Sequence, residues 1–132
     1  MAELTRKQRE FLENPFLAVV TTLRPDGSPH STVVWQEPLD GGVSFNTETG
    51  RVKPANLERD PRASLLVVDS NDPYRWLSVS GPAELTYDGA PEQIDRLSAK
   101  YTGKTPYASH PETERRVTVL VRPEKVTAYN LD

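Results

Sequence analysis

The stretch FLAVVTTLRPDGSPHSTVVW, residues 16–35, decides the fold, because it holds two candidate strands joined by a tight turn. Residues 16–24 are mostly aliphatic, aromatic or threonine residues, which favour extended structure. Residues 25–28, PDGS, combine a fixed proline dihedral with an Asp-Gly pair that accepts a chain reversal. Residues 29–37 then return as a second strand. The stretch therefore predicts an antiparallel hairpin.

Short elements continue on both sides of this hairpin. Thr5 and Gln8 form a capping-box pattern that predicts an N-terminal helix, which ends before Pro15. Turn signals and apolar runs predict further strands at residues 43–48, 63–69, 74–87 (with a bulge or bend at Gly81-Pro82), 117–121 and 126–129, and helices at residues 53–60 and 90–101.

This order of elements is typical of a mainly β (α+β) protein. We expect about seven strands and about three short helices, with connections too short for parallel crossovers. An antiparallel barrel with helices packed outside accommodates such strands. Since no repeat or linker interrupts the 132 residues, we expect residues 1–132 to form a single domain.

Composition excludes several classes of function. The chain has no cysteine, which excludes thiolate chemistry and thiolate metal sites, and its net charge of -3 gives no indication of nucleic-acid binding. His30 and His110 do not have metal-ligand spacing, so we expect no metal. We see no signal peptide and no membrane-spanning stretch, and therefore expect a cytoplasmic protein that does not bind membranes.

Residues 45–57, FNTETGRVKPANL, carry the main chemical signal. Thr47 and Thr49 can donate hydroxyl hydrogen bonds, Arg51 offers a planar fork and Lys53 a point charge. The helix predicted to begin here adds unpaired N–H groups and the positive end of its dipole. The pattern suits a phosphate, although a solvated loop with two exposed cations would show the same residues.

Residues 74–81, YRWLSVSG, place aromatic residues beside an arginine at the start of a strand. Arg75 and Trp76 could flank a planar ring, or Trp76 could fill the barrel core. Trp35 is open to the same two interpretations.

Taken together, these segments resemble the pyridoxamine 5′-phosphate oxidase-like split-barrel superfamily, and most closely its actinobacterial branch of F420-dependent enzymes, which use a deazaflavin. The resemblance runs from about Phe11 to Tyr129. It rests on the order of VVTTL (19–23), DGSPH (26–30), VVW (33–35), GRVK (50–53) with Asn56-Leu57, RDPRAS (59–64) and RWLS (75–78) followed by Gly81.

The resemblance implies an antiparallel, six- to seven-stranded FMN-binding split barrel with short flanking helices, working as a homodimer with the cofactor at the subunit interface. It implies that the phosphate arm of the cofactor lies against Asn46, Thr47, Arg51 and Lys53, with Asn56 close by.

The resemblance also implies where the ring of the cofactor lies. The ring would lie along the backbone of Thr32, Val33 and Val34, and Trp76 and Arg75 would come from the second subunit. Substrate would stack near Trp35.

For the reaction, the resemblance implies hydride transfer between coenzyme F420 and a small enone, quinone-like or imine substrate. Vitamin B6 oxidation is disfavoured, because the chain ends at Asn130-Leu131-Asp132 without the basic tail of true pyridoxamine phosphate oxidases. No catalytic residue is evident, and Tyr74, Tyr107 and His30 are weak candidates for a proton donor.

Three alternatives stay open at this point. The first is an FMN-dependent oxidoreductase on the same fold, the second a non-catalytic cofactor- or tetrapyrrole-binding protein, and the third a purely structural barrel. Arg59 and Arg62, which follow the phosphate segment, favour the acidic tail of the deazaflavin.

Overall fold

The computed structural model describes residues 3–107 and 115–131, which form one antiparallel sheet and three helices. The helices are α1 (Arg6–Leu12), α2 (Val52–Arg59) and α3 (Ala90–Thr102). The strands are β1 (Ala18–Leu23), β2 (Pro29–Val34), β3 (Glu37–Leu39), β4 (Gly42–Glu48), β5 (Arg62–Asp69), β6 (Asp72–Thr86), β7 (Arg116–Val121) and β8 (Lys125–Tyr129).

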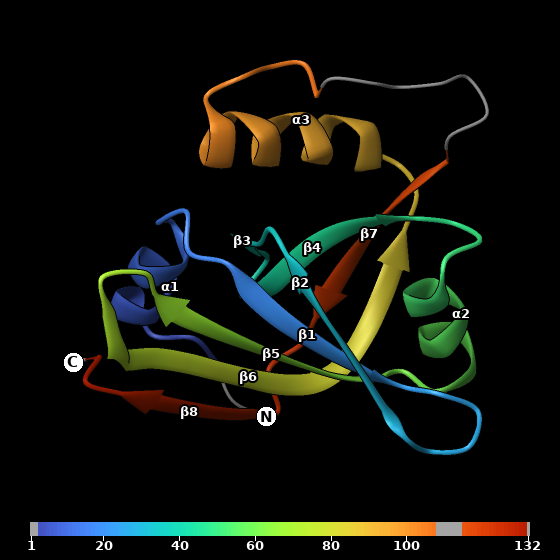
Figure 1. Ribbon diagram of the computed structural model, residues 1–132, viewed down its shortest axis with the longest axis horizontal. Helices are drawn as coiled ribbons and strands as arrows, with labels where there is room; N and C mark the ends of the chain where they lie inside the picture. Colours follow the sequence, from blue (N-terminus) through green and yellow to red (C-terminus); the bar gives the residue numbers. More distant parts are fainter. Residues whose placement is uncertain (1–2, 108–114, 132) are drawn as a thin grey trace.

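The sheet is strongly curled but open. Its strand order is β2-β1-β5-β6-β7-β4-β3, with β8 pairing with β6 beside this path. β2 and β3 are therefore the two ends of the sheet (Figure 1), and the sheet is not closed between them. This arrangement confirms the predicted antiparallel α+β split barrel. It has eight strands, one more than the sequence indicated.

The extra strand comes from a wrong boundary, since the strand predicted at residues 29–37 is two elements. β2 ends at Val34, and β3 begins at Glu37 and pairs with β4 instead. Between them the fully buried Gln36 donates through Nε2 to the carbonyls of Leu12 and Phe16, at 3.1 and 3.3 Å. The strand predicted over residues 29–37 is therefore interrupted by a side chain that bonds to the backbone of another segment.

β6 is the long strand that joins the two halves of the sheet. It pairs with β8 as far as Ser80 and with β7 from Ala83 onward, and it curves upward between these regions (Figure 1). The predicted bend at Gly81-Pro82 is confirmed (Figure 1), but no bulge occurs there, because the register with β5 is unbroken; that register shifts at Val68/Asp69 instead. At Gly81 a Cβ would overlap the carbonyl oxygen of Arg122, so only glycine fits this corner.

The core lies inside the curl. The predicted capping box is confirmed: Thr5 Oγ1 accepts from the Gln8 N–H, and Gln8 Oε1 accepts from the Thr5 N–H. α1 thereby presents Phe11 and Leu12 to the core. The largest fully buried apolar side chains are Phe11, Leu12, Phe45, Leu65, Leu77 and Leu97.

The opposite side of the β2-β1-β5-β6-β8 surface carries a row of apolar side chains, which we call the outer apolar face. Val19 lies opposite both Val33 and Leu66 in the register, and Trp76 lies opposite Val68 and Tyr129. The rings of Trp76 and Tyr129 stack with centroids 5.8 Å apart. Val33 is 61% exposed, so this face continues to the edge of the sheet. The face consists of Val19, Val33, Leu66, Val68, Trp76 and Tyr129.

Candidate functional site

A groove of about 290 Å³ brings together residues of the edge strand β2, the end of β4, the start of α2 and the inner side of α3. It is lined by Leu17, Val33, Val34, Trp35, Asn46, Thr47, Arg51, Lys53, Ile94, Leu97, Tyr107 and Arg116. The open end of the sheet at β2 thus becomes one wall of a cleft, which α3 covers.

The start of α2 forms a cationic end of this groove. Arg51 is the N-cap residue of α2, and no side chain caps the first turn, which also contains no acidic residue. The N–H groups of that turn and the positive end of the helix dipole therefore remain available to an anion. Lys53 is half-buried, and this burial, together with the charge of Arg51, lowers the pKa of its ammonium group.

A third cation comes from a distant part of the sequence. Arg116, the first residue of β7, has a side chain only 10% exposed, and it lies opposite Glu48 in the β4–β7 register. Its Nη2 lies 3.2 Å from Glu48 Oε1, and Arg51 Nη2 lies 3.5 Å from the same oxygen. One carboxylate therefore serves two guanidinium groups, and no Asp or Glu is among the described residues that line the groove.

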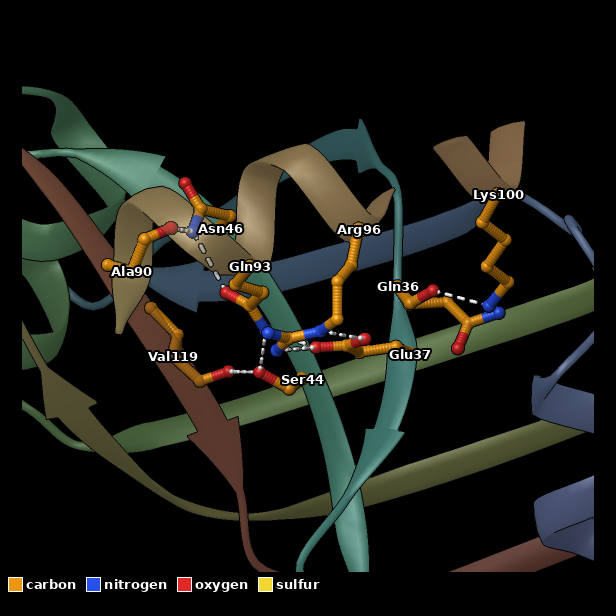
Figure 2. A network of polar contacts seen from close by, with 9 residues as sticks. All are labelled: Gln36, Glu37, Ser44, Asn46, Ala90, Gln93, Arg96, Lys100 and Val119. Atoms are coloured by element: carbon orange, nitrogen blue, oxygen red, sulfur yellow. Dashed lines mark hydrogen bonds and ion pairs between the residues drawn. The ribbon is translucent and has the colours of Figure 1, made fainter. Parts of the chain in front are cut away.

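A polar network holds this end of the groove to α3 (Figure 2). Asn46 Nδ2 donates to the Ala90 carbonyl and to Gln93 Oε1, both at 2.9 Å. The fully buried Gln93 donates in turn to Ser44 Oγ at 2.7 Å and to Glu37 Oε2 at 3.1 Å. Both hydrogen bonds that the Asn46 amide donates therefore go to α3. Its side-chain oxygen lies 3.5 Å from Arg116 Nη1.

The other end of the groove is apolar and aromatic. Trp35 stacks on Tyr101 with centroids 5.3 Å apart and meets the edge of Tyr107 at 6.2 Å. The Tyr101 hydroxyl donates to the Phe16 carbonyl at 2.6 Å, which fixes the stack, and burial raises the pKa of this phenol. Ile94 contributes to the aliphatic wall from α3. This end suits a flat, apolar group.

The structure brings together most of the residues that were predicted to bind a cofactor or substrate. Seven of them line the groove: Val33, Val34, Trp35, Asn46, Thr47, Arg51 and Lys53. Thr32 lies beside them on β2, and its buried Oγ1 has no hydrogen-bond partner among the described residues.

Three predicted residues lie outside this groove. Asn56 is buried and donates to Thr22 Oγ1 at 3.0 Å, so it attaches α2 to β1. Arg75 pairs with Asp69 at 3.0 Å and lies over the Phe11 ring. Trp76 belongs to the outer apolar face. None of the three lines the groove.

Other residues of and after the phosphate segment lie outside the groove. Thr49 Oγ1 donates to the Arg115 carbonyl at 3.3 Å and does not line the groove. Arg59 donates to the Leu23 carbonyl, and Arg62 pairs with Asp60 at 2.7 Å. Neither arginine lines the groove, and their role toward an acidic ligand tail stays a prediction. Sequence reasoning missed Arg116, because only the β4–β7 pairing brings it beside Glu48.

Among the weak candidates for a proton donor, Tyr107 lines the groove, whereas Tyr74 and His30 do not. His110 lies outside the described residues. Across residues 3–107 and 115–131 no group of three or more His, Cys, Asp or Glu side chains could hold a metal ion. None of the helices in these ranges has the length and apolarity that a membrane crossing requires.

Comparisons with known proteins identify the family of this chain. The family model of pyridoxamine 5′-phosphate oxidase matches residues 4–130. An F420H(2)-dependent biliverdin reductase of Mycobacterium tuberculosis (strain CDC 1551 / Oshkosh) is 30% identical over 125 residues, covering 88% of this chain and 81% of that protein.

Two solved structures have a fold similar to that of this chain. An F420 reductase superimposes with a TM-score of 0.80 and 28% identity, covering 94% of this chain and 98% of its own. A conserved hypothetical protein from Mycobacterium tuberculosis gives a TM-score of 0.74 and 27% identity, covering 96% of this chain and 84% of its own.

Proposed function

Since this chain belongs to the pyridoxamine 5′-phosphate oxidase family of oxidoreductases, we propose that it is a reductase that binds coenzyme F420 in the groove between β2, β4 and α3. One observation carries the proposal: an uncapped helix N-terminus and three cations lie in the same groove as an aromatic wall. The similarity to F420-dependent reductases supports the deazaflavin over other cofactors of the family.

The cationic end would hold the phosphate of the cofactor. Arg51 and Lys53 would donate charge-assisted hydrogen bonds, and the Thr47 hydroxyl and the first N–H groups of α2 would add neutral ones. Arg116 would add its charge from β7. These groups would fix one end of the cofactor and so set the position of its ring.

The ring would lie along β2, against Val33 and Val34, where Trp35 and Tyr107 leave room for a flat acceptor. Reduced F420, when bound there, would supply the hydride for reduction of an enone, quinone-like or imine acceptor. The chain's own contribution would be to hold the acceptor against the ring and exclude water with the apolar wall. Of the proton-donor candidates Tyr74, Tyr107 and His30, Tyr107 is the one that lines the groove.

We further propose a homodimer that assembles through the outer apolar face. Ligand sites that enclose drug-sized molecules usually measure about 300–1,000 Å³, so this groove encloses only part of a cofactor. Val33 belongs both to the groove and to the outer apolar face, which places the groove at the border of that face. A second copy there would complete the cleft, with Trp76 as its contribution. Arg75, which lies over the buried Phe11 ring on the core side of β6, would not face that copy. We propose that this dimer works in the cytoplasm.

FMN is the second candidate, because its phosphate would use the same cations and the family is named for a flavin enzyme. A protein that binds F420, FMN or a tetrapyrrole without turnover is the third. The relative that reduces biliverdin makes this tetrapyrrole the first acceptor to test.

The deciding experiment is a fluorescence titration with F420 and, separately, with FMN, beside a sizing column. Reduced cofactor is then mixed with biliverdin and with a panel of enones and quinones, and its reoxidation is followed by absorbance. Tight binding of F420 by a dimer, with reoxidation, supports the proposal. Preference for FMN supports the second candidate, binding without turnover supports the third, and binding of neither cofactor removes the assignment.

A further inference from the structure

Glu48 is a carboxylate that lies directly behind two of the three cations of the groove. It follows Thr47 at the end of β4, and its side chain is 29% exposed. Its Oε1 contacts the guanidinium groups of Arg51 and Arg116, at 3.5 and 3.2 Å. Both arginines line the groove, whereas Glu48 does not.

The arrangement sets the charge that an incoming ligand meets. Among the described residues, the three cations Arg51, Lys53 and Arg116 exceed the carboxylate of Glu48 by two positive charges. Arg116 cannot turn away readily, because its side chain is 10% exposed and lies over the Tyr107 ring, with the guanidinium carbon 5.1 Å from the ring centroid. Glu48 therefore orients two donors and simultaneously reduces the positive potential they offer.

The repulsion that Glu48 exerts grows with the charge of the ligand. A phosphate monoester such as that of FMN carries a charge of about −1.5 to −2 at neutral pH, because its second pKa is about 6. A phosphodiester, the form of the phosphate in F420, carries one negative charge at any such pH. A fixed carboxylate beside the site therefore penalises the monoester nearly twice as much as the diester.

We propose that Glu48 is a specificity-determining residue, which makes the anion site favour singly charged phosphodiesters over doubly charged phosphate monoesters. This inference rests on the proposed function only in assigning the groove to a phosphate-bearing cofactor. Charge discrimination at the phosphate would explain why this chain prefers the deazaflavin. The discrimination would come from a residue that contacts the arginines and not the ligand.

The test is Glu48→Gln, which keeps an oxygen that accepts from both guanidinium groups and removes the charge. A unit charge about 6 Å from the ligand, at an effective dielectric constant of about 40–80, corresponds to about three- to tenfold in affinity per ligand charge. FMN should gain about 10- to 100-fold and F420 about three- to tenfold, so the preference shifts toward FMN by about three- to tenfold. Glu58→Gln, an exposed carboxylate on α2, is the matched control and should change neither affinity.

Methyl phosphate and dimethyl phosphate serve as a second pair of probes, because they carry the two charge states without ring or tail. Their binding is followed by the amide NMR shifts of Val52 and Lys53. In Glu48→Gln, methyl phosphate should gain more than dimethyl phosphate. Equal gains for both probes, no gain, no binding of either probe, or the same gain in Glu58→Gln would overturn the inference. If neither F420 nor FMN binds but the methyl phosphates discriminate, the proposed function fails and the role of Glu48 stands.

Discussion

Replacing Lys53 with methionine tests the anion site most directly. The substitution keeps an unbranched apolar stem and removes the ammonium group at the start of α2. Because this group is half-buried beside Arg51, it is already partly desolvated, and an anion that reaches it would form a strong, charge-assisted hydrogen bond. Loss of such a bond costs about 1.5–3 kcal/mol, which corresponds to a dissociation constant for F420 or FMN raised about 10- to 150-fold.

The fold should not suffer from this change. Burial and Arg51 lower the pKa of Lys53, so its charged form opposes folding at neutral pH, and Lys53→Met should unfold at an equal or slightly higher urea concentration. The assay is fluorescence titration of each cofactor in the wild type, in Lys53→Met and in Lys125→Met, whose lysine is exposed on β8. A dissociation constant unchanged in Lys53→Met, or raised equally in Lys125→Met, would refute the phosphate assignment.

Three further predictions concern the dimer, the network and a buried lysine. Leu66→Glu places a carboxylate in the outer apolar face and should give a folded monomer on a sizing column, whereas a persistent dimer would contradict the proposed interface. Gln93→Leu leaves its buried hydrogen-bond partners unsatisfied and should lower the free energy of unfolding in urea by about 2–4 kcal/mol; a loss under about 1 kcal/mol would mean that the network contributes little. Burial lowers the pKa of Lys100 from 10.5 to about 8, so between these pH values the folded state binds fewer protons than the unfolded state. The free energy of unfolding of the wild type should therefore rise with pH across this window relative to Lys100→Met, by about 1–2 kcal/mol given the partial exposure of the amine. Lys104→Met, which removes an exposed lysine and keeps Lys100, should show the same rise as the wild type.

The fold was predictable because its signals are local. The capping box at Thr5, the PDGS turn and the helix around Ile94 each depend on residues close together in sequence, and each appears where the pattern indicated. The break between β2 and β3 was not predictable in this way. It depends on the Gln36 side chain reaching the backbone near Leu12 and Phe16, which no local pattern reports.

The cationic part of the candidate site was also predictable, because its signal is local in the sequence. Arg51 and Lys53 lie on one turn, so the cationic start of α2 could be read from consecutive residues. Arg116 reaches the groove through strand pairing, and Asn56 is turned away from it by a hydrogen bond to Thr22; both depend on tertiary contacts.

The corner at Gly81 fixes how the two halves of the sheet are joined. A Cβ there would overlap the Arg122 carbonyl oxygen, so any other residue would push β6 away from the chain after β7. Since β6 pairs with β8 before this corner and with β7 after it, such a shift would disturb both halves at once. The groove between β2, β4 and α3 does not include this corner, so the side chains that line the groove can be exchanged while the corner stays fixed.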